Sequence, residues 1–156
     1  MISIERPGQG NLEIEFLLID FEGTLATDKR VHPKVKDKMN LLSKRTKIYI
    51  LTKGDQELVA EVLGKVKTEV IYLKEGEASQ GKLNLLRQLG ATRTVAIGNG
   101  ADDAPILEEA GLGICVMSKE GTSSEGMKKA DVVVSNILDA LDFLLKPLRH
   151  RATLGL

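Results

Sequence analysis

The sequence predicts an α/β fold in which a mostly parallel β-sheet is covered by helices on both faces. Short apolar stretches of strand length alternate along the chain with longer stretches of helical periodicity. Several apolar stretches end in a polar residue close to a glycine, as the stretch 17–20 does at Asp20. Strands of open α/β sheets bind ligands at this carboxyl edge. Asp20 therefore stands where a fold of this class places its chemistry.

Composition limits the possible partners. The chain has 156 residues, and residues 1–156 are expected to form a single domain. It carries 22 basic and 22 acidic residues, which argues against nucleic acid or an anionic membrane as a partner. The single cysteine, Cys115, excludes a disulfide framework and favours a reducing, cytoplasmic location. No apolar run is long enough to span a membrane, and the first residues do not resemble a signal peptide.

The first half of the chain predicts a hairpin followed by alternating strands and helices. Residues 2–6 and 12–15 alternate around a Pro-Gly turn and lead into the strand that ends at Asp20. Pro33 opens a helix that runs to about residue 45. A strand at 47–51, a helix at 56–66 capped by Asp55, and a strand at 69–73 follow.

The second half continues the same alternation. After a third helix that ends at Gly90, the expected elements are a strand at 94–97, a helix at 102–110, a strand at 113–117, a short helix near 123–129, a strand at 131–134 and a helix at 137–145. The basic tail 146–151 is interpreted as a solvated end, with an interface or phosphate-facing role as the alternative.

Polar residues follow the strand ends in an ordered series. Asp20 and Glu22 follow the first long strand, and Thr52 follows the next. Lys82 stands near the start of the third helix, and the glycine-rich segment 98–103 follows the strand 94–97. Each alone has an ordinary explanation, because such threonines usually form turns or caps, lysines are usually solvated, and acids are favoured in a first helical turn. Their joint occurrence in this order indicates an active site.

The motifs at these positions also carry a resemblance. They are Asp20-Phe21-Glu22-Gly23-Thr24-Leu25, Ile50-Leu51-Thr52, Lys82, Gly98-Asn99-Gly100-Ala101-Asp102-Asp103-Ala104-Pro105 and Gly111-Leu112-Gly113-Ile114. On these motifs essentially the whole chain resembles the haloacid dehalogenase-like superfamily, mostly phosphatases. It looks most similar to small soluble P-type-ATPase-like proteins, which are related to the phosphorylation domain of those pumps. The resemblance implies a Rossmann-like three-layer core, a Mg²⁺ cofactor and a phosphoaspartate intermediate.

The chemistry of the residues agrees with that mechanism. A carboxylate such as Asp20 is a competent nucleophile toward phosphorus. Mg²⁺ held by a few carboxylates would offset the repulsion between the two anions. Lys82 supplies a fixed positive charge for the phosphoryl oxygens, Thr52 supplies a hydrogen bond, and backbone N–H groups after Asp20 would cradle the same oxygens. The expected phosphate-binding set is Phe21, Gly23, Thr52, Lys53 and Lys82.

The expected metal ligands come from two motifs. Asp20 supplies one oxygen, and the resemblance implies the main-chain carbonyl of Glu22 as another. In the last motif the position that is commonly Asp in the superfamily is Asn99, and the position that is commonly Asn is Asp102. We expect Asp103 near the metal, directly or through water, with Asn99 as a neutral oxygen ligand. Asp102 is either a second ligand or a helix-capping acid.

Glu22 departs from the superfamily pattern. Most of its phosphatases place Asp two residues after the nucleophile, as the general acid and then the general base, whereas P-type pumps have Thr there. Glu22 is an acid of the right kind but one methylene longer, about 1.5 Å. A general acid must come within hydrogen-bonding distance of the proton that it transfers. Glu22 therefore decides between an efficient phosphatase and a slow phosphoryl acceptor.

The chain between the motifs leaves no room for an inserted cap domain. Ordinary strand–helix connections use up the residues between Thr24 and Thr52 and those between Thr52 and Lys82. The site is therefore expected to be open, or covered by a second copy in a homo-oligomer. The N-terminal hairpin is a candidate interface, because its edge strand needs covering.

Three functional hypotheses follow. The favoured one is a Mg²⁺-dependent phosphohydrolase that uses Asp20 as nucleophile on a phosphorylated small molecule or macromolecule. The second is a phosphoryl-accepting or phosphate-binding regulatory module with slow or no turnover, similar to an isolated pump phosphorylation domain. The third is a scaffold with a decayed site, which would not be expected to keep Asp20, Thr52, Lys82 and Asp103 together.

Overall fold

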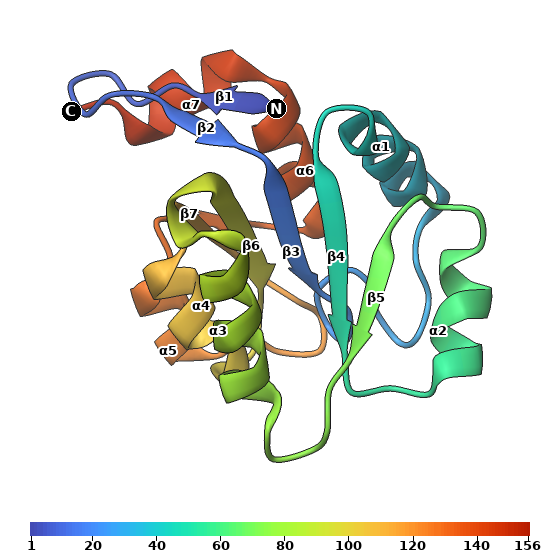
Figure 1. The fold of residues 1–156 in the computed structure, drawn as a ribbon. Helices are drawn as coiled ribbons and strands as arrows, with labels where there is room; N and C mark the ends of the chain where they lie inside the picture. The colour runs from blue at the N-terminus through green and yellow to red at the C-terminus, as the bar shows by residue number, and fades with distance from the viewer.

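A six-stranded parallel sheet forms the centre of the computed structural model, which describes all residues from 1 to 156 (Figure 1). Its strand order is β5-β4-β3-β6-β7-β8, and every neighbouring pair is parallel. The strands are β3 (Phe16–Asp20), β4 (Lys47–Thr52), β5 (Glu69–Tyr72), β6 (Thr94–Gly98), β7 (Leu112–Val116) and β8 (Val132–Val134). The α/β class, the parallel sheet and each of these strands are as predicted.

Helices cover both faces of the sheet, which makes three layers (Figure 1). One face is covered by α1 (Pro33–Ser43), α2 (Gln56–Leu63) and α6 (Ile137–Leu145). The other carries α3 (Ala78–Leu89), α4 (Ala104–Glu109) and α5 (Ser124–Lys129). Short 3₁₀ turns, Ala91–Arg93 and Ala101–Asp103, precede β6 and α4. No helix is long and apolar enough to cross a membrane.

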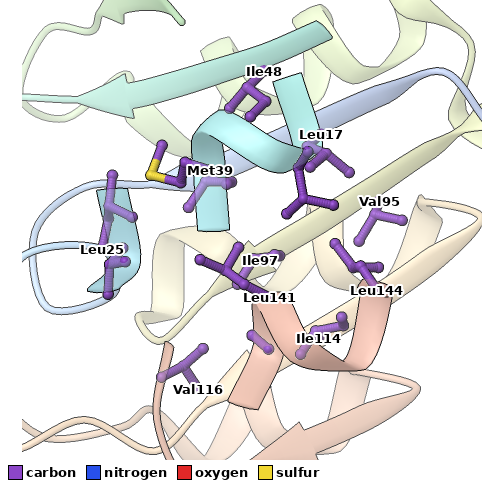
Figure 2. Close-up of a cluster of buried hydrophobic side chains, with 14 of the residues drawn as sticks. Leu17, Leu25, Met39, Ile48, Val95, Ile97, Ile114, Val116, Leu141 and Leu144 are labelled. Carbon is purple, nitrogen blue, oxygen red and sulfur yellow. The ribbon is translucent and has the colours of Figure 1, made fainter. Parts of the chain in front are cut away.

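Alternation along the strands divides the core into two clusters. Successive side chains of a strand point to opposite faces, so Leu17 and Ile19 join the larger cluster while Leu18 joins the smaller. Figure 2 shows strand residues of the larger cluster facing Met39 of α1 and Leu141 of α6. In the smaller cluster α4 lies so close to β7 that a Cβ at Gly113 would overlap the carbonyl of Leu107. Both faces are therefore packed tightly against helices.

The order of the strands creates a switch point beside β3. From β3 the chain moves outward through β4 to β5, then returns across the sheet through α3 to β6 on the other side of β3. Asp20 is the last residue of β3, Thr52 ends β4 and Gly98 ends β6. Because these strands are parallel and adjacent, their carboxyl ends meet at one edge, the usual ligand site of open α/β sheets.

The chain termini pack together at the opposite, amino edge of the sheet (Figure 1). The predicted hairpin forms a separate antiparallel pair, β1 (Ile2–Ile4) and β2 (Leu12–Ile14). The tail 146–151 is exposed as expected except at His150, but it is not a loose end, because the C-terminal residues form α7 (Pro147–Leu154) against this hairpin. The Glu5 amide donates to Nδ1 of His150 (3.3 Å), and Arg151 pairs with the Glu5 carboxylate (2.5 Å). The basic composition of the tail predicted exposure and gave no sign that His150 is buried.

His150 makes the packing of α7 sensitive to pH. Its side chain is fully buried, and its Nε2 lies 2.6 Å from the carbonyl oxygen of Phe143. Burial lowers the pKa of His150, although the Phe143 carbonyl and the charge of Glu5 oppose that shift. As the pH falls below the pKa of an unfolded histidine, about 6.5, the unfolded chain binds the proton more readily, so stability is lost.

We therefore expect acidification from about pH 7.5 to about pH 5.5 to lower the melting temperature more in the wild type than in His150→Gln. Thermal denaturation followed by circular dichroism measures this difference. His32, the other histidine of the chain, is exposed, so His32→Gln should keep the wild-type pH dependence. Equal pH dependence in the wild type and His150→Gln would contradict the assignment.

Candidate active site

Four chain segments meet at the carboxyl edge of the sheet. Asp20, Thr52 and the segment 98–103 arrive at the ends of β3, β4 and β6. Lys82 comes from the first half of α3 and reaches the same place with its side chain, which is 1% exposed. No inserted domain covers them, because only α1 and β4 separate Thr24 from Thr52, and only α2, β5 and the start of α3 separate Thr52 from Lys82. The predicted capless arrangement is thus present.

The Lys82 ammonium is the centre of the charged cluster. Its Nζ lies 2.7 Å from Asp103 Oδ1, 3.0 Å from Asp20 Oδ1 and 3.2 Å from Asp102 Oδ2. Asp103 is fully buried and Asp20 is 5% exposed, whereas the side chain of Asp102 is 26% exposed. A buried ammonium that contacts three carboxylates is fixed in position and carries less charge than the acids around it.

The imbalance of charge shifts the pKa of both main partners. Burial and the neighbouring charge of Asp103 raise the pKa of Asp20 well above its ordinary value, and the contact with Lys82 opposes the shift only in part. For Lys82, burial disfavours the ammonium, but the charges of Asp103 and Asp20 outweigh it and raise its pKa. Lys82 therefore stays charged. The ionised form of Asp20 is disfavoured unless further positive charge lies nearby.

Asp103 fixes the loop that follows β6. Its Oδ2 accepts hydrogen bonds from the backbone amides of Asn99 and Gly100, both at 3.0 Å. Its Oδ1 faces Lys82, so both carboxylate oxygens are occupied. A Cβ at Gly98 would overlap this carboxylate, which explains why glycine ends the strand. Here Asp103 anchors the loop and the lysine together.

Thr24 is a site residue that the sequence reasoning missed. Its hydroxyl oxygen lies 3.2 Å from Asp20 Oδ2 and 2.9 Å from Asn99 Oδ1, so it links the two motifs. The Asn99 amide nitrogen donates to the carbonyl of Gly121 (3.0 Å), which turns its oxygen toward Thr24. The signal for Thr24 was its place in the first motif directly after Gly23, whose φ of +75° forms the sharp turn. Nothing local in the sequence pointed to Gly121.

Glu22 and Thr52 are in direct contact. The Thr52 hydroxyl donates a hydrogen bond to Glu22 Oε1, and the backbone amide of Gly54 donates to the Thr52 oxygen (2.9 Å). Glu22 is exposed, whereas Thr52 is buried. The longer acid therefore reaches across the mouth of the site and engages the hydroxyl that was expected to bind phosphate.

The other expected phosphate-binding groups are differently placed. The amide of Phe21 donates to Leu51 and that of Gly23 donates to Ala26, both at 2.9 Å, while the intervening amide of Glu22 has no backbone acceptor. Lys53 lies at the rim, with its Nζ 3.5 Å from Asp102 Oδ2 and 3.8 Å from Glu75. In this arrangement Glu22 N–H is the free backbone donor, and Lys53 adds positive charge at the entrance.

The donor set suits a hard divalent cation. No group of three or more His, Cys, Asp or Glu side chains is arranged around a common metal position. Oxygens of Asp20 and Asn99 nevertheless both lie within 3.2 Å of the Thr24 hydroxyl oxygen, and the acids exceed the cations in the cluster. Mg²⁺ prefers one or two carboxylates with further oxygen ligands and water. The residues present therefore fit a Mg²⁺ ion held mainly by Asp20 and Asn99.

Sequence comparison finds relatives in one archaeon. No known protein-family profile matches the chain. The uncharacterised protein MJ0073 of Methanocaldococcus jannaschii is 42% identical over 84 residues, which are 51% of this chain and 90% of that protein. The two belong to one family. A soluble P-type ATPase-like phosphatase of the same organism is 24% identical over 131 residues, 81% of this chain, and the match spans only 48% of that protein.

Comparison of structures identifies the fold. The 3-deoxy-D-manno-octulosonate 8-phosphate phosphatase of Moraxella catarrhalis, solved with magnesium, phosphate and the octulosonate, superposes with a TM-score of 0.72 at 15% identity, covering 86% of this chain and 87% of that one. The corresponding cobalt-bound phosphatase of Haemophilus influenzae gives 0.69 at 16% identity, covering 86% and 89%. A protein of Streptomyces avermitilis described as a HAD-family hydrolase gives 0.69 at 18%, covering 88% of both chains. The chain has the haloacid dehalogenase-like (HAD-like) fold.

The HAD-like fold confirms the resemblance indicated by the motifs. Its Rossmann-like, three-layer arrangement is present here, together with the predicted N-terminal hairpin. The structure brings the four predicted catalytic side chains, Asp20, Glu22, Thr52 and Lys82, to one edge of the sheet. Their chemical roles remain predictions.

Proposed function

We propose that this protein is a Mg²⁺-dependent phosphohydrolase that forms an aspartyl-phosphate on Asp20. The observation that carries the proposal is the contact between Asp20 and the buried Lys82 ammonium at the switch point of the sheet. A buried carboxylate beside a fixed cation at this edge is arranged for attack on an anionic phosphoryl group. The phosphatases that share the HAD-like fold support the same reaction class.

In the first step a carboxylate oxygen of Asp20 forms a bond to phosphorus while the bond from phosphorus to the leaving oxygen breaks. Lys82 and the Thr52 hydroxyl stabilise the charge on the phosphoryl oxygens. Glu22 in its protonated form gives its proton to the leaving oxygen. Mg²⁺ held by Asp20 and Asn99 would supply the positive charge that lets the ionised nucleophile approach the phosphate.

In the second step Glu22, now a carboxylate, removes a proton from water, and the water oxygen attacks phosphorus. The bond between phosphorus and Asp20 breaks, which releases inorganic phosphate and restores the free carboxylate. Asp103 keeps Lys82 and the amides of Asn99 and Gly100 in place through both steps. The substrate would be a phosphorylated small molecule, and the open rim leaves a phosphorylated macromolecule as an alternative.

A slow phosphoryl acceptor is the second candidate, and the contact between Glu22 and Thr52 favours it. While the Glu22 carboxylate accepts the hydrogen bond from Thr52, it is held at that hydroxyl and does not face a bound phosphoryl group. If the contact persists in the phosphoenzyme, water is not activated and the aspartyl-phosphate is long-lived. The protein would then resemble a freestanding pump phosphorylation domain.

One experiment separates the two. The protein is incubated with Mg²⁺ and acetyl phosphate, the intact mass is measured over time, and released phosphate is assayed in parallel. Rapid release, lost on addition of EDTA, supports the phosphohydrolase. A long-lived mass increase of one phosphoryl group supports the acceptor. The assay is then extended to a panel of sugar, nucleotide and acyl phosphates. If no compound gives phosphate release or a mass increase, both proposals are contradicted.

Shortening Glu22 tests its contact with Thr52. Aspartate at this position is too short to hold the Thr52 hydroxyl, so Thr52 becomes free for the phosphoryl group and the acid takes the length usual in the superfamily. We expect Glu22→Asp to raise turnover of an aryl phosphate about fivefold, the equivalent of one ordinary hydrogen bond. Steady-state kinetics measures this effect.

The matched variant is Glu22→Gln, which keeps the length but cannot transfer a proton. Its turnover should fall by about 10² or more. An unchanged or lower rate in Glu22→Asp would mean that Glu22 is already well placed or that the chemical steps do not limit turnover.

We also propose that the chain acts as one domain in a reducing, cytoplasmic setting. Its one cysteine, Cys115, is buried and free, and burial together with the charge of Asp103 raises the pKa of its thiol.

The exposed rim around Glu22 and Lys53 would allow a second copy to cover the site. The hairpin expected as that interface lies at the opposite edge of the sheet, where α7 packs against it.

A further inference from the structure

A second pocket, here called the flanking pocket, lies beside the candidate active site. Its volume is about 400 Å³. One wall is the turn after β3, including Gly23 and Thr24, and the other is formed by the segments that follow β7 and β8. The flanking pocket lies at the carboxyl edge of the sheet, on the β7 side of Asp20.

The flanking pocket carries an uncompensated positive charge. Arg30, His32 and Lys119 line it, and no aspartate or glutamate does. Neither Arg30 nor Lys119 has a carboxylate within 4.0 Å. In the active site, by contrast, both Lys53 and Lys82 are paired with carboxylates. Two cations without a carboxylate partner in one pocket favour an anionic occupant.

The neutral polar groups of the flanking pocket present donors as well. Nδ1 of His32 accepts the amide hydrogen of Lys34 (3.1 Å), so in the neutral ring the proton is on Nε2. Oδ1 of Asn136 accepts from the amide of Asp139 (2.9 Å), which leaves its NH₂ group free. The Ser118 oxygen accepts from the amide of Glu120 (3.1 Å), which leaves its hydroxyl hydrogen free. In each of the three side chains the acceptor atom is occupied by a backbone amide, and an N–H or O–H group remains available to a ligand.

The flanking pocket and the active site share a wall. Gly23, which lines the pocket, directly follows the predicted acid Glu22, and the hydroxyl of Thr24 lies 3.2 Å from Asp20 Oδ2. The turn 27–30 is tied to the loop after β7, because the Asp28 amide donates to Glu120 Oε2 (3.2 Å). Because the turn 23–24 separates Asp20 from the pocket, a leaving group that passes over Gly23 would enter the pocket.

We propose that the flanking pocket binds a second anionic group, a carboxylate or a phosphate, on the leaving group of the substrate. This inference rests on the proposed phosphohydrolase and narrows its substrates to phosphate monoesters with two separate anionic groups. Arg30 and Lys119 contact the second anion, while His32, Ser118 and Asn136 donate hydrogen bonds to it. Uncharged leaving groups would lack this anchor.

Binding to the Asp20→Asn variant with Mg²⁺ tests the proposal without turnover. Isothermal titration calorimetry compares 6-phosphogluconate with glucose 6-phosphate, and fructose 1,6-bisphosphate with fructose 6-phosphate. The first pair detects a carboxylate and the second pair a phosphate. We expect the doubly anionic member of at least one pair to bind about tenfold more tightly.

Adding Arg30→Gln with Lys119→Gln should remove that preference. The control adds Lys65→Gln with Lys67→Gln, which removes the same charge from exposed lysines that carry no ion pair and should leave the preference intact. Equal binding within both pairs, no binding of any ligand, or a preference that survives the Arg30 and Lys119 substitutions overturns the inference. A preference without hydrolysis by the wild type would instead refute the phosphohydrolase and leave the anion site standing.

Discussion

Asp20→Asn should abolish phosphate release and phosphoryl labelling while leaving the protein folded. An amide cannot act as the nucleophile toward phosphorus, so the first covalent step is lost and the rate should fall by about 10⁴ or more. The fold should survive, because Asn keeps an oxygen that can accept from Lys82, 3.0 Å from Asp20 Oδ1 in the wild type. Phosphate release and intact mass after incubation with acetyl phosphate measure both losses.

The same substitution should also stabilise the protein without Mg²⁺. Burial and the charges of Asp103 and Asp102 raise the pKa of Asp20, so its ionised form costs stability at neutral pH. Removing that charge is expected to raise the melting temperature, by about 2–4 °C for each kcal/mol gained. The gain should shrink toward about pH 4, where the unfolded carboxyl also takes up a proton. A variant that keeps its turnover, or that melts below the wild type at neutral pH, would contradict this account.

Lys82→Met should cost both activity and stability. Methionine has a similar length but no charge, so the phosphoryl oxygens lose a donor that is worth about 10³ in rate. Asp103 is fully buried and would lose the ammonium 2.7 Å from its Oδ1. Breaking a buried ion pair by removal of one partner costs about 3–5 kcal/mol. Urea denaturation and phosphate-release assays measure the two effects.

Lys53→Met is the matched control for the loss of stability. Its side chain is 33% exposed and its Nζ lies 3.5 Å from Asp102, which Lys82 also contacts. A pair this exposed contributes at most about 1 kcal/mol. Similar losses of stability in the two variants would show that the Lys82 cluster does not hold the loop after β6 in place.

The sequence was sufficient for the sheet and for the position of the site. The strands are short apolar runs bounded by turn residues, so their positions could be predicted to within about one residue. The polar residues after them followed the chain order that a parallel sheet brings together. Asp20, Thr52 and the segment 98–103 meet because β3, β4 and β6 are adjacent. That adjacency follows from the way parallel strands with helical connections are wound.

Local patterns failed where a side chain acts through a distant partner. α7 was missed because its one buried residue, His150, contacts the hairpin at the other end of the chain. The sequence near His150 gives no sign of that contact. Thr24 was missed because its role depends on Asn99, which arrives from another strand. The contact of Glu22 with Thr52 depends on how far two loops project above the sheet, and no spacing in the chain encodes that distance.

The two bonds that Asp103 accepts from the loop after β6 have a consequence for how this site can vary. Because one carboxylate positions both Lys82 and the amides of Asn99 and Gly100, the groups that would handle the phosphoryl oxygens move as a unit with β6. Substitutions elsewhere in the rim leave that unit undisturbed. If the proposed site is correct, we expect related proteins to change their leaving-group preference through the turn 27–30 and the loop after β7, while Asp103 and the groups that it positions stay the same.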